Sequence, residues 1–279
     1  MLGSSTPTCY TPDPRANYLE DWEYAKSSAG VWHLLLRGAP EIETHVLRAW
    51  PRATRAALLP RHQPHWTNRV KLDFTPHSEL TDFLKMLKRV LTLKIQERSR
   101  VDGAIALDFY SRLSDSAPNA LEYTATADIV RTIKGYQKRS LAELDHAERT
   151  LLDSLTDVIV THPWLSSADR ILPVPGHAGN TQASASVRIG HALHRDLGIQ
   201  LTDVHVRNKS RKPTKDMTRW EREQLLHEFR ITEDLSDKTV LIVDDICHTG
   251  FTLAGVATAA RQAGAATILG LVAARNFRR

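Results

Sequence analysis

The thirteen residues from 240 to 252 constrain the fold of this chain more than any other segment. Val240–Val243 is an apolar run that predicts a buried strand, and two acids, Asp244 and Asp245, follow it directly. Ile246–Phe251 then predicts a tight loop, and Thr252 begins a helical pattern. A strand that ends in polar residues and leads into a helix is typical of parallel α/β sheets, which bind ligands at this edge.

The surrounding sequence supports an α/β fold with a mostly parallel sheet flanked by helices. From about residue 123, apolar strand patterns alternate with helical ones. Helical spacing of Ile and Leu marks two segments between 129 and 155. The other predicted elements are a proline-stopped strand at 171–175, a helix at 184–197 ended by Gly198, a strand at 239–243, a helix at 252–262 and a strand at 267–273.

Three regions are predicted along the chain. Residues 1–30 contain Pro7, Pro12 and Pro14 and are expected to form a loosely ordered arm. Residues 31–120 form an accessory region of unassigned role, which we expect to be largely helical. Its clearest helix covers 79–91, with Ser78 as candidate N-cap. Residues 121–279 form the α/β domain.

Composition restricts the class of protein without naming a function. The 279 residues carry a net charge of +5, which suits a phosphorylated ligand or nucleic acid but proves neither. Cys9 and Cys247 offer no disulfide framework and no zinc-ligand spacing. No apolar run approaches the ~20 residues that span a bilayer. We therefore expect a soluble, cytoplasmic protein with no membrane partner.

The loop after Asp245 has the residues of a phosphate-binding site. Gly250 permits a tight turn, and Thr249 and Thr252 add hydroxyls to the backbone N–H groups of a helix start. Paired carboxylates repel an anion, so they must face hydroxyls or a metal. A ribose 5-phosphate with hydrated Mg²⁺ meets both requirements. The alternative is that Asp-Asp is only a strand-end turn and Thr-Gly-x-Thr only a helix start.

Residues 240–252 resemble the phosphoribosyl pyrophosphate (PRPP) motif of type I phosphoribosyltransferases, in which four apolar residues precede two acids and a Thr-Gly-x-Thr loop. Within this family, the chain resembles the ComF-like proteins. Tyr123 with Ile133-Lys134 is similar to their entry helix, residues 172–175 to their pyrophosphate-loop strand, and residues 213–222 to their polar segment. The resemblance covers about residues 123–275.

The resemblance implies the type I phosphoribosyltransferase fold, PRPP as substrate and Mg²⁺ as cofactor. Asp244 and Asp245 are then catalytic and hold the metal through water. The implied PRPP phosphate-binding residues are Ile246, Cys247, His248, Thr249, Gly250, Phe251 and Thr252, and the implied pyrophosphate loop is Pro175, Gly176 and His177.

The sequence departs from the ComF-like pattern at three places. It has no cysteine pair for an N-terminal zinc ribbon, and residues 176–182 replace the usual basic run after the proline-rich strand. His248 stands where the relatives commonly carry Thr. By analogy with the acidic residue of purine-salvage members, His248 is a candidate to contact or deprotonate an incoming base. The alternative is a solvated loop histidine.

A basic segment precedes the last Asp-Asp strand. Within residues 207–223 it contains Lys209, Arg211, Lys212 and Lys215. These residues are predicted to fold over the site as a mobile lid that neutralises pyrophosphate, or else to form a solvated loop. The scattered histidines 162, 177, 191 and 194 have no partner at metal-ligand spacing, and Trp164 is expected to pack under the domain.

Two functions fit these observations. The first is a phosphoribosyltransferase that transfers the phosphoribosyl group of PRPP to a nucleobase or similar nitrogen acceptor. The second is a non-catalytic PRPP- or nucleotide-binding regulator, or a DNA-uptake-associated ComF-like factor. Nucleic acid and a homodimeric partner stay open in both cases.

Overall fold

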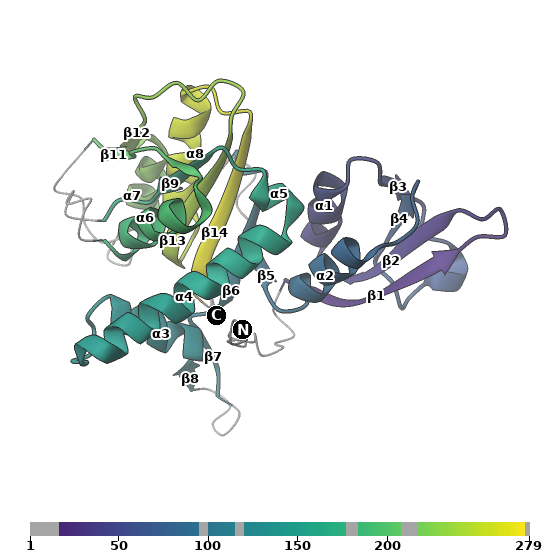
Figure 1. The fold of residues 1–279 in the computed structure, drawn as a ribbon, viewed down its shortest axis with the longest axis horizontal. Helices are drawn as coiled ribbons and strands as arrows, with labels where there is room; N and C mark the ends of the chain where they lie inside the picture. Colours follow the sequence, from purple (N-terminus) through teal and green to yellow (C-terminus); the bar gives the residue numbers. More distant parts are fainter. Residues whose placement is uncertain (1–16, 95–99, 115–119, 177–183, 208–216, 277–279) are drawn as a thin grey trace.

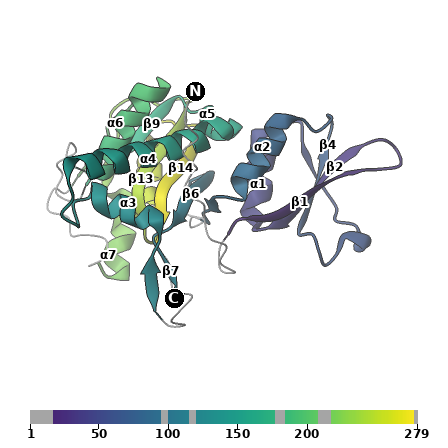
Figure 2. The ribbon, with the colours of Figure 1, turned by 60° about the horizontal axis from the view of Figure 1, so that its bottom comes forward.

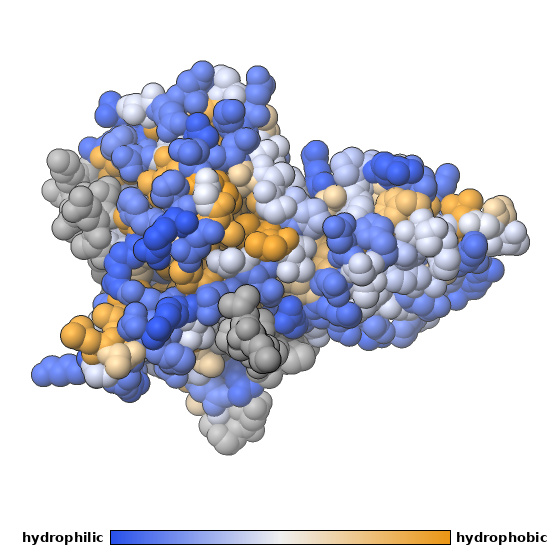
Figure 3. All heavy atoms as spheres, viewed as in Figure 1, coloured by the Kyte–Doolittle hydropathy of each residue, from blue (hydrophilic) through white to orange (hydrophobic). Residues whose placement is uncertain are grey.

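The computed structural model describes residues 17–94, 100–114, 120–176, 184–207 and 217–276. They form two lobes, of which the smaller, N-terminal one projects from the side of the larger (Figure 1). The space-filling view shows mostly hydrophilic atoms over both lobes (Figure 3). Apolar atoms on the larger lobe include the side chain of Val160, which is 62% exposed.

The smaller lobe is a four-stranded antiparallel sheet with two helices on one face, in the order β1-β2-β4-β3. Alternating side chains of the strands, such as Leu34 and Leu36, pack against the helices in one core. The elements are β1 (Leu19–Lys26), β2 (Trp32–Gly38), α1 (Pro40–Ala49), β3 (Thr54–Ala56), β4 (Asn68–Leu72) and α2 (Ser78–Leu87).

The smaller lobe differs from the sequence-based expectation in three respects. It contains a full sheet beside its two helices, and β1 lies inside the predicted arm. The helix expected at 79–91 ends at Leu87, and Leu91 instead begins a strand. The N-cap is His77, whose Nδ1 accepts from the Leu80 N–H, and not Ser78. An imidazole nitrogen performs here the capping role that usually falls to a hydroxyl or carboxylate.

The larger lobe is built on a six-stranded sheet in the order β10-β9-β13-β14-β6-β5, parallel except for β5. This confirms the predicted mostly parallel α/β sheet. The strands are β5 (Leu91–Thr92), β6 (Gly103–Phe109), β9 (Arg170–Pro173), β10 (Gln200–Leu201), β13 (Thr239–Cys247) and β14 (Thr267–Arg275). Because β5 and β6 precede the boundary expected near residue 120, the sheet draws two strands from the region expected to be accessory.

Helices cover both faces of this sheet. One face packs against α3 (Ala125–Ile133), α4 (Leu141–Thr161) and α6 (Ala185–Leu197), and the other against α8 (Phe251–Gln262). Figure 2 shows α4 crossing in front of β13 and β14. The remaining elements are the hairpin β7 (Ser111–Leu113) and β8 (Leu121–Tyr123), α5 (Pro163–Ser166), β11 (His205–Val206), α7 (Arg219–Gln224) and β12 (Phe229–Arg230).

A cluster of buried rings joins the two lobes. His162 Nε2 lies 2.9 Å from His45 Nδ1, and the ring of Phe83 packs edge-on against His162. The Trp164 N–H donates to His162 Nδ1, so the neutral His162 carries its proton on Nε2 and donates it to His45. Gly103 lies beneath Trp164, where a Cβ atom would come within 2.6 Å of the ring. The joint is therefore tightly packed and contains two buried imidazoles.

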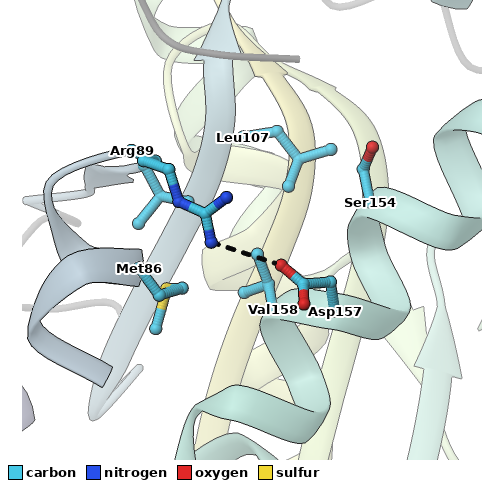
Figure 4. Close-up of a pocket in the computed structure, with 7 residues that line it drawn as sticks. Met86, Arg89, Leu107, Ser154, Asp157 and Val158 are labelled. Carbon is cyan, nitrogen blue, oxygen red and sulfur yellow. Dashed lines mark hydrogen bonds and ion pairs between the residues drawn. The ribbon is translucent and has the colours of Figure 1, made fainter. Parts of the chain in front are cut away.

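A small pocket opens in the same joint (Figure 4). Its lining comes from the end of α2, from β6 and from α4, and consists of Met86, Arg89, Val90, Leu107, Ser154, Asp157 and Val158. Arg89 Nη2 lies 3.5 Å from Asp157 Oδ2, and the Ser154 hydroxyl donates to the Thr150 carbonyl. Because these polar groups already have partners, the pocket is not a candidate functional site.

Candidate functional site

Strand β13 carries the predicted acids to the carboxyl edge of the sheet. Val240–Val243 is fully buried between β9 and β14, and Asp244 and Asp245 are each only 8% exposed. The strand continues to Cys247, so the turn is shorter than the loop predicted for 246–251. The carboxyl ends of β13, β14 and β6 point toward α3 and the β7–β8 hairpin (Figure 1).

Each carboxylate has its own set of partners. The Ser186 hydroxyl and the Asp245 backbone N–H both donate to Asp244 Oδ1, at 3.0 and 2.9 Å. Lys134 Nζ donates to Asp245 Oδ2 at 2.7 Å. Ser186 lies in the first turn of α6 and Lys134 directly follows α3. Two helices on one face of the sheet thus converge on the acid pair.

Burial makes this pair of acids electrostatically costly. Burial, together with the neighbouring Asp245, raises the pKa of Asp244 to about 7, against the opposing effects of Lys134 and the two hydrogen bonds. Burial also acts to lower the pKa of Lys134, but Asp245, with smaller contributions from Tyr136 and Asp244, more than offsets it, so the pKa of Lys134 is raised. Two acids with one ammonium therefore leave the site able to accept further positive charge.

The turn after β13 forms an open helix start. Gly250 has a φ of 79°, in the left-handed region that glycine favours, and caps α8 without any side-chain hydrogen bond. The first N–H groups of a helix have no partner within the helix. The buried Thr249 Oγ1 has no hydrogen-bond partner among the described residues. This arrangement suits an anion with several oxygen acceptors.

His248 is held at the same edge of the sheet by a residue from the next strand. Asn276 Nδ2 lies 2.8 Å from His248 Nδ1, and the Asn276 N–H donates to the Cys247 carbonyl at 2.9 Å. The backbone of β6 joins them, because the Tyr110 N–H donates to the Arg275 carbonyl. The carboxyl ends of three neighbouring strands therefore meet around His248.

The remaining predicted residues fall into three groups. Pro175 and Gly176 follow β9, where the Val174 N–H donates to the Val243 carbonyl, so this loop begins beside the acid pair. Cys247 is buried, Phe251 packs against Met217 and Leu225, and Thr252 is half-buried at the start of α8. His177, Lys209, Arg211, Lys212 and Lys215 lie outside the described residues.

Three residues at this edge of the sheet escaped sequence reasoning as site residues: Lys134 and Ser186, which contact the acids, and Asn276, which contacts His248. Each reaches the site from another element, so no local pattern marks it. The only sequence feature that pointed toward one of them was the resemblance of the segment around Lys134 to the entry helix. Among the described residues no group of three or more His, Cys, Asp or Glu side chains is placed to hold a metal. Nor is any helix in those residues both long and apolar enough to cross a membrane.

The segment that carries the acid pair matches the model of a known protein family. Residues 183–276 match the family model of the phosphoribosyl transferase domain, and this segment includes Ser186, both acids, the Gly250 turn and Asn276. The segment is similar to phosphoribosyltransferase domains. The match supports phosphoribosyl transfer in general and hence a transferase activity.

A solved structure and the curated proteins complete the comparison. The crystal structure of a purine phosphoribosyltransferase from Pyrococcus horikoshii Ot3 is 25% identical, with a TM-score of 0.28. The matched region covers 47% of this chain and 73% of that one. No curated protein matches the sequence.

Proposed function

We propose that the chain binds PRPP with Mg²⁺ and transfers its phosphoribosyl group to a nucleobase or similar nitrogen acceptor. One observation carries the proposal. Two buried carboxylates, Asp244 and Asp245, directly precede a glycine-capped helix start that contains the unpartnered Thr249 hydroxyl. Different parts of PRPP fit the two features of the site. The ribose hydroxyls donate to the carboxylates, and the phosphate accepts from the N–H and O–H groups of the helix start.

The turn and the acids would hold opposite ends of the ribose 5-phosphate. The phosphate accepts hydrogen bonds from the N–H groups at the start of α8 and from the hydroxyls of Thr249 and Thr252 beside them. The ribose hydroxyls donate to the carboxylates of Asp244 and Asp245. The Ser186 hydroxyl helps to hold the Asp244 carboxylate in place. The pyrophosphate lies toward Pro175 and Gly176, where His177 and the basic residues 209–215 remain predicted contributors.

The acid pair fits a magnesium ion held mainly through water and substrate. Buried carboxylates whose charges repel each other are stabilised by a nearby cation, and Mg²⁺ commonly takes one or two carboxylates together with substrate oxygens. When bound, Mg²⁺ supplies charge neutralisation for the departing pyrophosphate. The residues that would hold it, through water, are Asp244 and Asp245.

In the transfer, the acceptor nitrogen forms a bond to ribose C1 while the bond from C1 to the pyrophosphate oxygen breaks. The acceptor loses a proton, and His248 is the proposed base. The Asn276 contact determines how His248 performs this role. Its Nε2 acts as a base only in the tautomer with the proton on Nδ1, which requires Asn276 to present its amide oxygen there.

Pyrophosphate release tests the transfer directly. With PRPP, Mg²⁺ and a panel of nucleobases and amines, we expect release that depends on one class of acceptor and stops when Mg²⁺ is chelated. Reactions without acceptor measure slow hydrolysis as the control. If PRPP binds while no acceptor raises release above hydrolysis, the site serves binding alone, and the regulatory function replaces the proposal.

Substituting Thr249→Val tests the phosphate cradle. Valine keeps the shape of the side chain and removes an unpartnered buried hydroxyl, so the free energy of unfolding should stay the same or rise. PRPP affinity measured by calorimetry should fall about tenfold, the value of one hydrogen bond to a charged group. Thr258→Val, further along the same helix, is the control for binding. Equal PRPP affinity in wild type and Thr249→Val would remove this hydroxyl from the site.

A further inference from the structure

Lys134 has a position at the site that the proposed transfer does not explain. Its Nζ lies 2.7 Å from Asp245 Oδ2, and the two side chains are 22% and 11% exposed. The residue comes from outside the segment that matches the transferase family, 111 positions from Asp245. Its ammonium therefore reaches the acid pair from the end of α3.

The backbone around Lys134 is fixed by two hydrogen bonds. Arg188 Nη1 donates to the Ile133 carbonyl, and the Lys134 N–H donates to the Val130 carbonyl. Gly135, with a φ of 69°, then turns the chain away. The ammonium lies against the Asp245 carboxylate and near the ring of Tyr136, whose centre is 5.7 Å away, and the charge of Asp244 also acts on it. A flexible four-carbon side chain on a fixed backbone can change partners without refolding.

Charge balance gives a reason for such a change of partner. In the free protein, the ammonium offsets one of two buried carboxylates that repel each other. A divalent cation bound at the same acids would repel the ammonium, and the pyrophosphate that arrives with it offers new anionic acceptors.

Resting on the proposed function, we propose that Lys134 is a further substrate-binding residue. It pairs with Asp245 in the free protein and moves to a pyrophosphate oxygen when PRPP and Mg²⁺ bind. Lys134 thus competes with free Mg²⁺ for the acids but assists the binding of PRPP.

This dual role predicts opposite changes in two affinities. In Lys134→Met, Mg²⁺ alone should bind about tenfold more tightly and PRPP with Mg²⁺ about tenfold more weakly, because one charge-assisted contact is lost from each state. Lys134→Gln should show the same pair of changes and serves if the methionine variant fails to fold. Lys134→Arg, which keeps the charge, should restore most of the PRPP affinity. The exposed Lys138→Met is the matched control.

Calorimetric titration with MgCl₂ alone, and with PRPP at fixed MgCl₂, measures both affinities without any activity assay. If both affinities weaken together in Lys134→Gln, or neither changes, Lys134 is only a structural ion pair and the inference is overturned. If wild-type protein binds no PRPP, the proposed function itself fails. The two failures are therefore distinguishable.

Discussion

Replacing Asp244 and Asp245 together with asparagine should abolish magnesium-dependent binding of PRPP. Asparagine keeps the size of each side chain and its ability to accept a hydrogen bond, so the Ser186 contact can persist. It removes both negative charges, and with them the groups proposed to hold Mg²⁺ and the ribose hydroxyls. Calorimetry at saturating Mg²⁺ and in chelator should give the same, undetectable PRPP binding for the double variant.

The single substitutions separate binding from stability. Asp245→Asn leaves the Lys134 ammonium without its carboxylate partner, so it should lower the free energy of unfolding more than Asp244→Asn does. Asp153→Asn, at an exposed position on α4, controls for a general loss of negative charge. Wild-type PRPP affinity in a folded double variant would show that the carboxylates are not the ligand site.

The buried histidine joint should make the protein sensitive to mild acid. Burial lowers the pKa of His45 to about 4, and burial together with His45 places the pKa of His162 well below its ordinary value. In the unfolded chain the two histidines bind a proton near pH 6.5, whereas in the folded chain they stay neutral to a lower pH. Their contribution to stability is therefore fully present above pH 6.5 and is lost as the pH falls toward 4.

The expected loss is large for a single side chain. His45 alone should lower the free energy of unfolding by about 2 kcal/mol between pH 7.5 and pH 5, and His162 acts in the same direction. His45→Asn removes the titrating group and keeps an acceptor near the Nδ1 position. Urea unfolding of both proteins across this pH range should show a flatter profile for the variant, in which His162 alone of the pair still titrates.

The neighbourhood of the joint offers little compensation for an added charge. Arg48 lies over the Trp164 ring, and the Arg89–Asp157 pair lies in the adjacent pocket. His146→Asn, at an exposed position on α4, is the control, and its pH profile should match the wild type. Parallel profiles for wild type and His45→Asn would contradict the assignment of acid sensitivity to this joint.

Several elements were predictable because their information is local. Residues 239–262 combine an apolar run, two acids, a glycine turn and a helical pattern, and the structure forms β13, the Gly250 turn and α8 there. The strand Arg170–Pro173, stopped by a proline, and the helix Ala185–Leu197, capped by Gly198, also follow from proline and glycine stop signals. The helical accessory region was the weakest expectation, because the apolar residues of β1 and β2 do not alternate strictly with polar ones, so the period-2 signal of a strand is weak.

By itself, the sequence determined the parallel α/β domain and the position of Asp244, Asp245 and the Gly250 turn, since a strand, a turn and a helix start are set by neighbouring residues. Only the tertiary structure decided which groups surround those acids and His248. Lys134, Ser186 and Asn276 arrive from α3, α6 and the end of β14. Packing on the sheet brings them together, and that packing depends on burial summed over the whole core, which no short pattern records.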